Sequence, residues 1–169
     1  MKPCRRAHAL AAAAIAGLAA GSQAATDCVL DTTVTASFGV YDGLQNDSAT
    51  TRITGRCSNS PLPGTTPAIA PVISLSTGLS GTYASRQMAR GASRLNYNLY
   101  TTAARTSVWG NGSGGTVTVP AYAAGSVRLS GRQTREFDHP NLTIHGRIPA
   151  DQGVPAGVYV DTIVVTMTF

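Results

Sequence analysis

The clearest alternation of hydrophobic and polar positions lies in residues 155–169, P-A-G-V-Y-V-D-T-I-V-V-T-M-T-F. From residue 159 onward, apolar side chains share one parity, and threonines with two valines occupy the other. A period of two that is rich in β-branched residues, after a Pro-Ala-Gly turn, is typical of a half-buried strand. No turn or further strand follows it in the sequence, so we expect an unpaired edge, which is a liability unless a partner covers it. The apolar set is Tyr159, Ile163, Val165, Met167 and Phe169.

Shorter alternating runs of the same kind recur along the rest of the chain, and no window outside the first residues shows a helical stripe. Loops rich in Gly, Pro, Asn and Asp separate them, predicted at 42–48, 61–71, 78–91 and 110–115. Many short strands at close spacing favour an all-β sandwich in a single domain. Strands are predicted over 28–40, 50–57, 72–76 and 95–100, and around Val117, Val127 and Leu142.

The first 24 residues are predicted to be a cleaved secretory signal. Lys2, Arg5 and Arg6 form a basic start, residues 9–20 are apolar but too few to span a bilayer, and Ser-Gln-Ala ends at Ala24. Cleavage after Ala24 leaves residues 25–169 as one exported domain, large enough for a sandwich core. We expect it in the periplasm and then at the cell surface, with no membrane span.

Charge and composition narrow the function classes. After cleavage ten basic and eight acidic residues remain, a net charge of +2, and the basic residues form no cluster or stripe in the sequence. Nucleic-acid binding therefore loses its main support.

The exported part holds two cysteines, Cys28 and Cys57. In an oxidising compartment such a pair is predicted to form a disulfide. The alternatives are a metal site and a redox pair. The cysteines are far apart in sequence and have no clustered His, which argues against a metal site. The sequence has no C-x-x-C, which argues against a redox pair. No cofactor is expected.

Residues that could carry catalysis form no persuasive constellation. His139 follows Asp138 in what we predict to be a turn, and His145 alternates with apolar neighbours on a predicted strand. Glu136 and Asp138 resemble a carboxylate pair, but nearby arginines favour a surface charge cluster. Because G-x-S-x-G and H-E-x-x-H are both missing from the sequence, we expect no enzymatic activity.

Two further side chains have open interpretations. Asp161 shares the parity of Tyr159 and Ile163, so it is either a structural latch facing inward or a bulge or rim position that reaches water. Trp109 precedes a glycine-rich run, and packing at the rim of the sandwich is favoured over a role as a surface anchor for a ligand.

Taken in order, several segments resemble the spore coat protein U domain family, which supplies subunits of archaic chaperone–usher pili. They are the early Cys28, F-G-x-Y-D at 38–42, Cys57, S-x-G at 76–78, R-x-M at 86–88, L-N-Y-N-L-Y-T at 95–101, W-G-N-G at 109–112 and P-A-G-x-Y-x-D-T at 155–162.

The resemblance implies an incomplete immunoglobulin-like sandwich that lacks its last strand and is completed by a donor strand. A periplasmic chaperone first lends this strand, and a neighbouring subunit replaces it as the outer-membrane usher assembles the fibre. The predicted acceptor groove is lined by Tyr159, Ile163, Val165, Met167 and Phe169.

Predicted cleavage leaves only residues 25–27 before Cys28, and three residues span about 10 Å at most. Such a segment is too short to serve as a donor, so we expect a subunit at the end of a fibre, most naturally the tip, with a part in adhesion and biofilm formation. The alternative is a free-standing secreted binding module that completes its own sheet.

Overall fold

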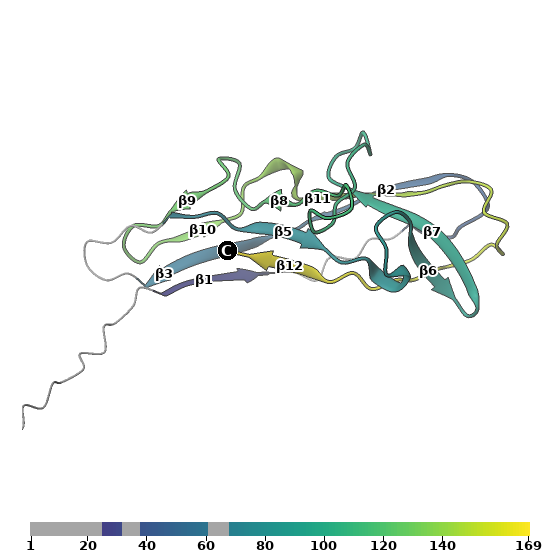
Figure 1. The fold of residues 1–169 in the computed structure, drawn as a ribbon, viewed down its shortest axis with the longest axis horizontal. Coiled ribbons are helices and arrows are strands. Elements are labelled where there is room, and N and C mark those ends of the chain that lie inside the picture. The colour runs from purple at the N-terminus through teal and green to yellow at the C-terminus, as the bar shows by residue number, and fades with distance from the viewer. Residues whose placement is uncertain (1–24, 32–37, 61–67) are drawn as a thin grey trace, which may run out of the picture.

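The fold is all-β, as the alternating pattern predicts (Figure 1). This computed structural model describes residues 25–31, 38–60 and 68–169. The predicted signal segment 1–24 and part of the predicted first strand lie outside these residues. The only helices within the described ranges are two short 3-10 turns, η1 (Gly78–Ser80) and η2 (Pro140–Leu142).

The strands form small antiparallel sheets that pack as a sandwich. One sheet has the order β1-β3-β10, comprising β1 (Ala25–Leu30), β3 (Gly55–Ser60) and β10 (Thr134–Glu136). A second has the order β2-β11-β7-β6, comprising β2 (Asn46–Arg52), β11 (Thr143–Ile148), β7 (Ser93–Tyr100) and β6 (Arg86–Arg90). A third has the order β12-β5-β8, comprising β12 (Val165–Thr168), β5 (Val72–Leu75) and β8 (Val119–Pro120). A two-stranded sheet pairs β4 (Ala68–Ile69) with β9 (Val127–Arg128).

One predicted strand, 50–57, is in fact two strands. The chain changes sheet at Ile53, because β2 pairs with β11 whereas β3 pairs with β1 and β10. The Ile53 side chain is buried between them, and its N–H donates to the Leu142 carbonyl at 2.9 Å. The loop predicted over 42–48 is also partly wrong, since β2 already begins at Asn46.

The loop predicted over 78–91 is wrong in its second half, which forms β6 and pairs with β7. Its inward parity carries Arg86 and Met88, and both side chains are buried. An arginine at an inward position hides the alternation that would mark a strand. By contrast, the strands predicted at 72–76 and 95–100 are confirmed as β5 and β7.

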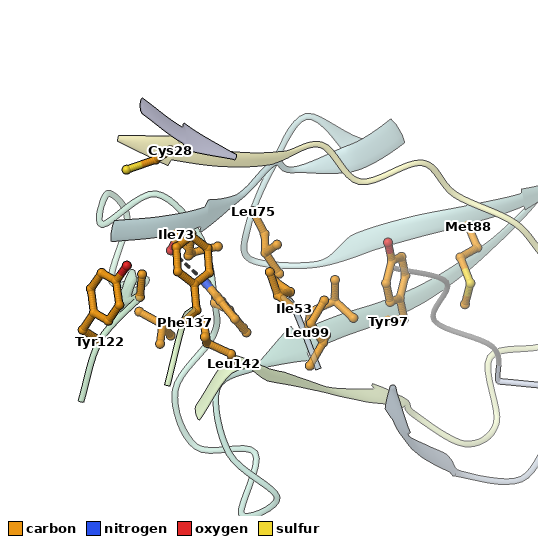
Figure 2. Close-up of a cluster of buried hydrophobic side chains, with 14 of the residues drawn as sticks. Cys28, Ile53, Ile73, Leu75, Met88, Tyr97, Leu99, Tyr122, Phe137 and Leu142 are labelled. Atoms are coloured by element: carbon orange, nitrogen blue, oxygen red, sulfur yellow. Dashed lines mark hydrogen bonds between the residues drawn. The ribbon is translucent and has the colours of Figure 1, made fainter. Parts of the chain in front are cut away.

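The core runs along the interior of the sandwich and receives side chains from all three larger sheets (Figure 2). Fully burying a large apolar side chain contributes about 1.5–3 kcal/mol. Trp109 is among the fully buried residues, and its Nε1–H donates to the Ile73 carbonyl at 3.0 Å. The packing interpretation of Trp109 is therefore confirmed, although the ring lies in the core and not at a rim. Buried members labelled in Figure 2 include Ile53, Ile73, Leu75, Met88, Tyr97, Leu99, Tyr122, Phe137 and Leu142.

Candidate binding edge at the last strand

The closing stretch alternates in burial as its sequence predicts, but only part of it is a paired strand. Side chains of the apolar parity are buried or half-buried from Tyr159 to Met167, and the opposite parity is exposed. The regular strand β12 is confined to Val165–Thr168, so the prediction of a continuous strand from residue 159 is wrong. The reason is a change of sheet in the middle of the stretch.

Before the change, single bridges join the stretch to the neighbourhood of β6: Gly157 pairs with Tyr41, and Val160 pairs with Ala89. Both backbone groups of Val160 bond to Ala89, at 2.8 and 3.0 Å. After the change, β12 pairs antiparallel with β5, with Val165 opposite Leu75 and Met167 opposite Ile73. The residues between the two pairings form a corner.

Asp161 fixes this corner. Its Oδ2 accepts a hydrogen bond of 2.7 Å from the Tyr97 phenol, and its Oδ1 accepts from the backbone N–H groups of Leu79 and Thr162 at 3.0 and 2.7 Å. Burial raises the pKa of Tyr97, and the hydrogen bond to Asp161 raises it further. The latch interpretation of Asp161 is therefore confirmed. A shallow depression of about 370 Å³ lies beside the latch, lined by Leu79, Ala89, Val160, Asp161 and Thr162.

Beyond the corner, β12 lies at the edge of its sheet. Its one neighbour there is β5, and no strand among the described residues pairs with its other side. Strand β1 likewise lies at the edge of its own sheet, with β3 as its one neighbour in the described part of the chain. Both views draw β1 (purple) beside β12 (yellow) (Figures 1 and 2). Two strand edges that no further strand of the described residues covers thus lie next to each other.

The five residues predicted to line an acceptor groove do not all lie together. Ile163, Val165 and Met167 are half-buried and pack against the core from the inner side of the last stretch. Tyr159 lies before the corner, where it is buried edge-to-face against Tyr41, and its hydroxyl donates to the Pro155 carbonyl at 2.7 Å. Phe169 follows β12 and is 56% exposed. Leu30, at the end of β1, is a further half-buried apolar residue packed against the core.

The predicted disulfide is confirmed between Cys28 and Cys57. The two residues lie directly opposite each other in the β1–β3 ladder, with Cα atoms 4.0 Å apart. The disulfide therefore links the edge strand β1 covalently to its neighbour β3.

A buried arginine near the corner was not expected from the sequence. Arg86 is fully buried and donates three hydrogen bonds, from Nε to the Ser76 carbonyl at 3.0 Å and from its terminal nitrogens to Asn98 Oδ1 and the Trp109 carbonyl at 2.6 Å. Burial lowers its pKa from the ordinary value. The parity it shares with Met88 was the one sequence signal for an inward position.

His139 and Asp138 have structural contacts that account for their positions. His139 Nδ1 accepts from the Asn141 N–H at 3.1 Å at the start of η2, and Asp138 Oδ1 accepts from the Ala123 N–H at 2.8 Å. His145 lies on β11, apart from both in sequence and pairing. Within the described ranges no group of three or more His, Cys, Asp or Glu side chains is placed to hold a metal ion.

The described residues thus form an all-β sandwich in which two strand edges lie side by side. The Spore Coat Protein U domain model matches residues 14–166, which is most of the sequence, so the chain belongs to this family. Membership implies a structural subunit of the pilus type that is exported to the cell surface. It also implies interactions with a chaperone, an usher and other subunits. The family is one of structural subunits and not of enzymes. The chain matches none of the curated proteins with which it was compared. In the part of the chain that the structure describes, no helix has the length and apolar character to cross a membrane.

Proposed function

We propose that this protein is a pilus subunit whose last strand accepts a donor strand, first from a periplasmic chaperone and then from a neighbouring subunit. The observation that carries the proposal is the edge of β12, unpaired among the described residues, with half-buried Val165 and Met167 on its inner face. The sandwich is then an immunoglobulin-like fold that lacks its last strand. The donor would lie between β12 and β1.

Strand addition matches the chemistry that this edge offers. Backbone N–H and C=O groups of β12 supply hydrogen bonds to any extended chain, which gives affinity without a sequence requirement. Alternate donor side chains would cover Ile163, Val165 and Met167, and each apolar side chain that becomes fully buried contributes about 1.5–3 kcal/mol. Phe169, now exposed, would be covered at the far end of the donor. Tyr159 supports the corner and is not itself covered.

We place the protein first in the periplasm and then in a surface fibre. Cleavage after Ala24 delivers it to the periplasm, and the usher then places it in a surface fibre. Cleavage there leaves three residues before Cys28, a segment too short to donate a strand. We therefore place the protein at a fibre end, the tip by preference, with a role in adhesion and biofilm formation. N-terminal sequencing of the exported form tests this placement, and a long apolar segment ahead of Cys28 would contradict it.

The test of strand acceptance is a thermal or urea unfolding series of the exported protein with a synthetic peptide of alternating apolar residues. A scrambled peptide of the same composition is the blank. Ligand linkage predicts a midpoint that rises with peptide concentration. Substituting Met167→Asp places a charge on the inner face and should abolish the rise, whereas Thr166→Asp, on the exposed face of the same strand, should leave most of it.

Two results would count against the proposal. An unfolding midpoint that no donor peptide or candidate chaperone shifts would favour a free-standing binding module. Equal responses of the Met167→Asp and Thr166→Asp proteins would show that the peptide binds elsewhere.

A further inference from the structure

The ten arginines of residues 25–169 fall into two groups. Seven have contacts within the protein. Arg86 is buried, and Arg56 pairs with Asp31. The other five either donate to backbone carbonyls or have another interaction within the protein; they are Arg52, Arg90, Arg94, Arg105 and Arg147. The remaining three, Arg128, Arg132 and Arg135, are exposed, and their guanidinium groups make no hydrogen bond or ion pair with the described residues.

These three free arginines occur together, in residues 128–136, which we call the arginine segment. It begins at the end of β9 and finishes with β10, and its turn passes through Gly131, which has a φ of 63°. The spacing of arginines in the sequence does not identify this group. These three differ from the other seven because the other seven have contacts within the protein. The sequence predicts no basic cluster in the exported domain. The arginine segment is an exception to that expectation.

The arginine segment is held firmly by the fold. Strand β10 pairs with β3, and the buried Asn59 of β3 binds the segment twice, from its N–H to the Gln133 carbonyl and from Nδ2 to the Leu129 carbonyl, both at 3.1 Å. The Tyr122 hydroxyl donates to the Arg135 carbonyl at 2.9 Å. Arginine side chains on a fixed backbone lose less freedom on binding than they would on a loose loop.

The segment lies at the end of the sandwich where β1 begins. Ala25 pairs with Ser60, and Thr134 pairs with Ser58 two residues earlier, so both lie at the same end of β3 (Figure 1). Three exposed carboxylates are nearby: Asp27 on β1, Glu136 on β10 and Asp138 just after β10, whose Oδ1 accepts from the Ala123 N–H. Glu136 faces away from Arg135, because successive residues of a strand point to opposite sides of the sheet.

We propose that the arginine segment binds an anionic polysaccharide through the carboxylate or sulfate groups of successive sugars. Guanidinium forks match the geometry of both oxyanions. A single exposed ion pair contributes little, so a useful affinity requires a ligand that engages several arginines at once, as a polymer with repeated charges does. The neighbouring aromatic rings, Tyr122 and Phe137, are buried against each other, so neither of them offers a platform for stacking a nucleic-acid base.

This proposal is independent of strand acceptance, since the segment is on β9 and β10 and not on β12. The test measures retention of the exported protein on immobilised alginate, which carries only carboxylates, and on dextran sulfate, which carries only sulfates. Neutral dextran is the blank. Binding to either charged polymer, weakened by added salt, is the expected result, and the preferred polymer identifies the anion.

The decisive comparison is between two variants with the same net charge. Arg132→Gln should weaken binding at least about threefold, and the triple variant R128Q/R132Q/R135Q about tenfold or more. Arg94→Gln removes one exposed charge from the start of β7, at the opposite end of the sandwich, and should leave binding unchanged. Equal losses in the Arg94 and Arg132 variants, retention on neither polymer, or tighter binding to duplex DNA than to both would each overturn the proposal.

Discussion

The Tyr97 phenol donates a hydrogen bond of 2.7 Å to Asp161 Oδ2, and this bond joins β7 to the corner where the last stretch changes sheet. The other carboxylate oxygen is held by two backbone N–H groups, so the charge of Asp161 is met by three donors. A carboxylate with three donors needs no ion-pair partner to be stable in a half-buried position. The corner in turn determines where β12 begins.

Removing the phenol should therefore destabilise the protein. Tyr97→Phe deletes one hydrogen bond to a charged acceptor, which costs about 1.5–3 kcal/mol in the free energy of unfolding. Urea unfolding of Tyr97→Phe, Asp161→Asn and the double variant gives their coupling energy. A coupling near zero would mean that the bond does not stabilise the corner.

The raised pKa of Tyr97 adds a test in alkali. The folded protein keeps the phenol protonated, whereas the unfolded chain ionises it near the ordinary value of 10.0. The stability that this group contributes is complete below that pH and is lost as the pH rises above it. The alkaline loss should be smaller in Tyr97→Phe than in the parent protein.

Gly78 should be far more sensitive to alanine than Gly81, although both have a positive φ, of 64° and 70°. The left-handed conformation costs an L-residue roughly 1–2 kcal/mol at either site. At Gly78 an added Cβ would also overlap Asp161 Oδ2, whereas the space around Gly81 is open. Unfolding midpoints of Gly78→Ala and Gly81→Ala check this, and equal shifts would contradict a close approach of Gly78 to the latch.

Arg86 should be intolerant of both truncation and the conservative change to lysine. Arg86→Ala leaves the Ser76 and Trp109 carbonyls without a donor in the core, and each unsatisfied group costs about 1–3 kcal/mol. Asn98 Oδ1 loses its charged donor and keeps only the Leu99 N–H. Lysine lacks the planar fork that reaches three acceptors. We expect a loss of at least about 3 kcal/mol in urea unfolding for alanine. A lysine variant as stable as the parent would show that the fork geometry is unimportant.

The sequence predicts the class of fold well because alternation is a local property of a strand. It predicts β5, β7 and the Cys28–Cys57 bond, since each follows from residues close together or from the chemistry of two thiols in an oxidising compartment. It misses β6 because a buried arginine occupies an inward position that the pattern reads as polar.

Changes of sheet are harder to predict. At both Ile53 and Asp161 the hydrogen-bonding partner changes from one sheet to another, and at Asp161 the burial alternation continues through the corner. Nothing in a single sequence reports the partner. For the same reason the sequence groups Tyr159 with Val165 and Met167, although the corner separates them.

Loss of the disulfide should destabilise the protein by about 3–4 kcal/mol, because the bond closes a loop with a sequence separation of 29. The comparison is between the parent protein and the double variant C28S/C57S in urea. Reduction of the parent with a thiol serves as the control and should give a similar shift. A loss below about 1 kcal/mol would mean that the β1–β3 ladder holds the edge strand without the bond.

His145 should make the protein sensitive to mild acid. Its Nδ1 is buried and has no hydrogen-bond partner among the residues that the structure describes. Burial lowers the pKa of His145 below its ordinary value of 6.5, and the charge of Arg105 lowers it further. The folded protein therefore holds a neutral imidazole under conditions in which the unfolded chain takes up a proton.

The sign of the effect follows from this difference. Above the ordinary value of 6.5 both states are neutral and the full stability is present. As the pH falls below it the unfolded state binds more protons, and stability is lost until the lowered pKa of the folded state is reached. Urea midpoints measured between about pH 7.5 and pH 5 should fall in the parent protein and change less in His145→Phe. His139→Asn, which keeps an acceptor for the Asn141 N–H, should retain the slope of the parent. A parent slope that persists in His145→Phe would assign the acid sensitivity to other groups.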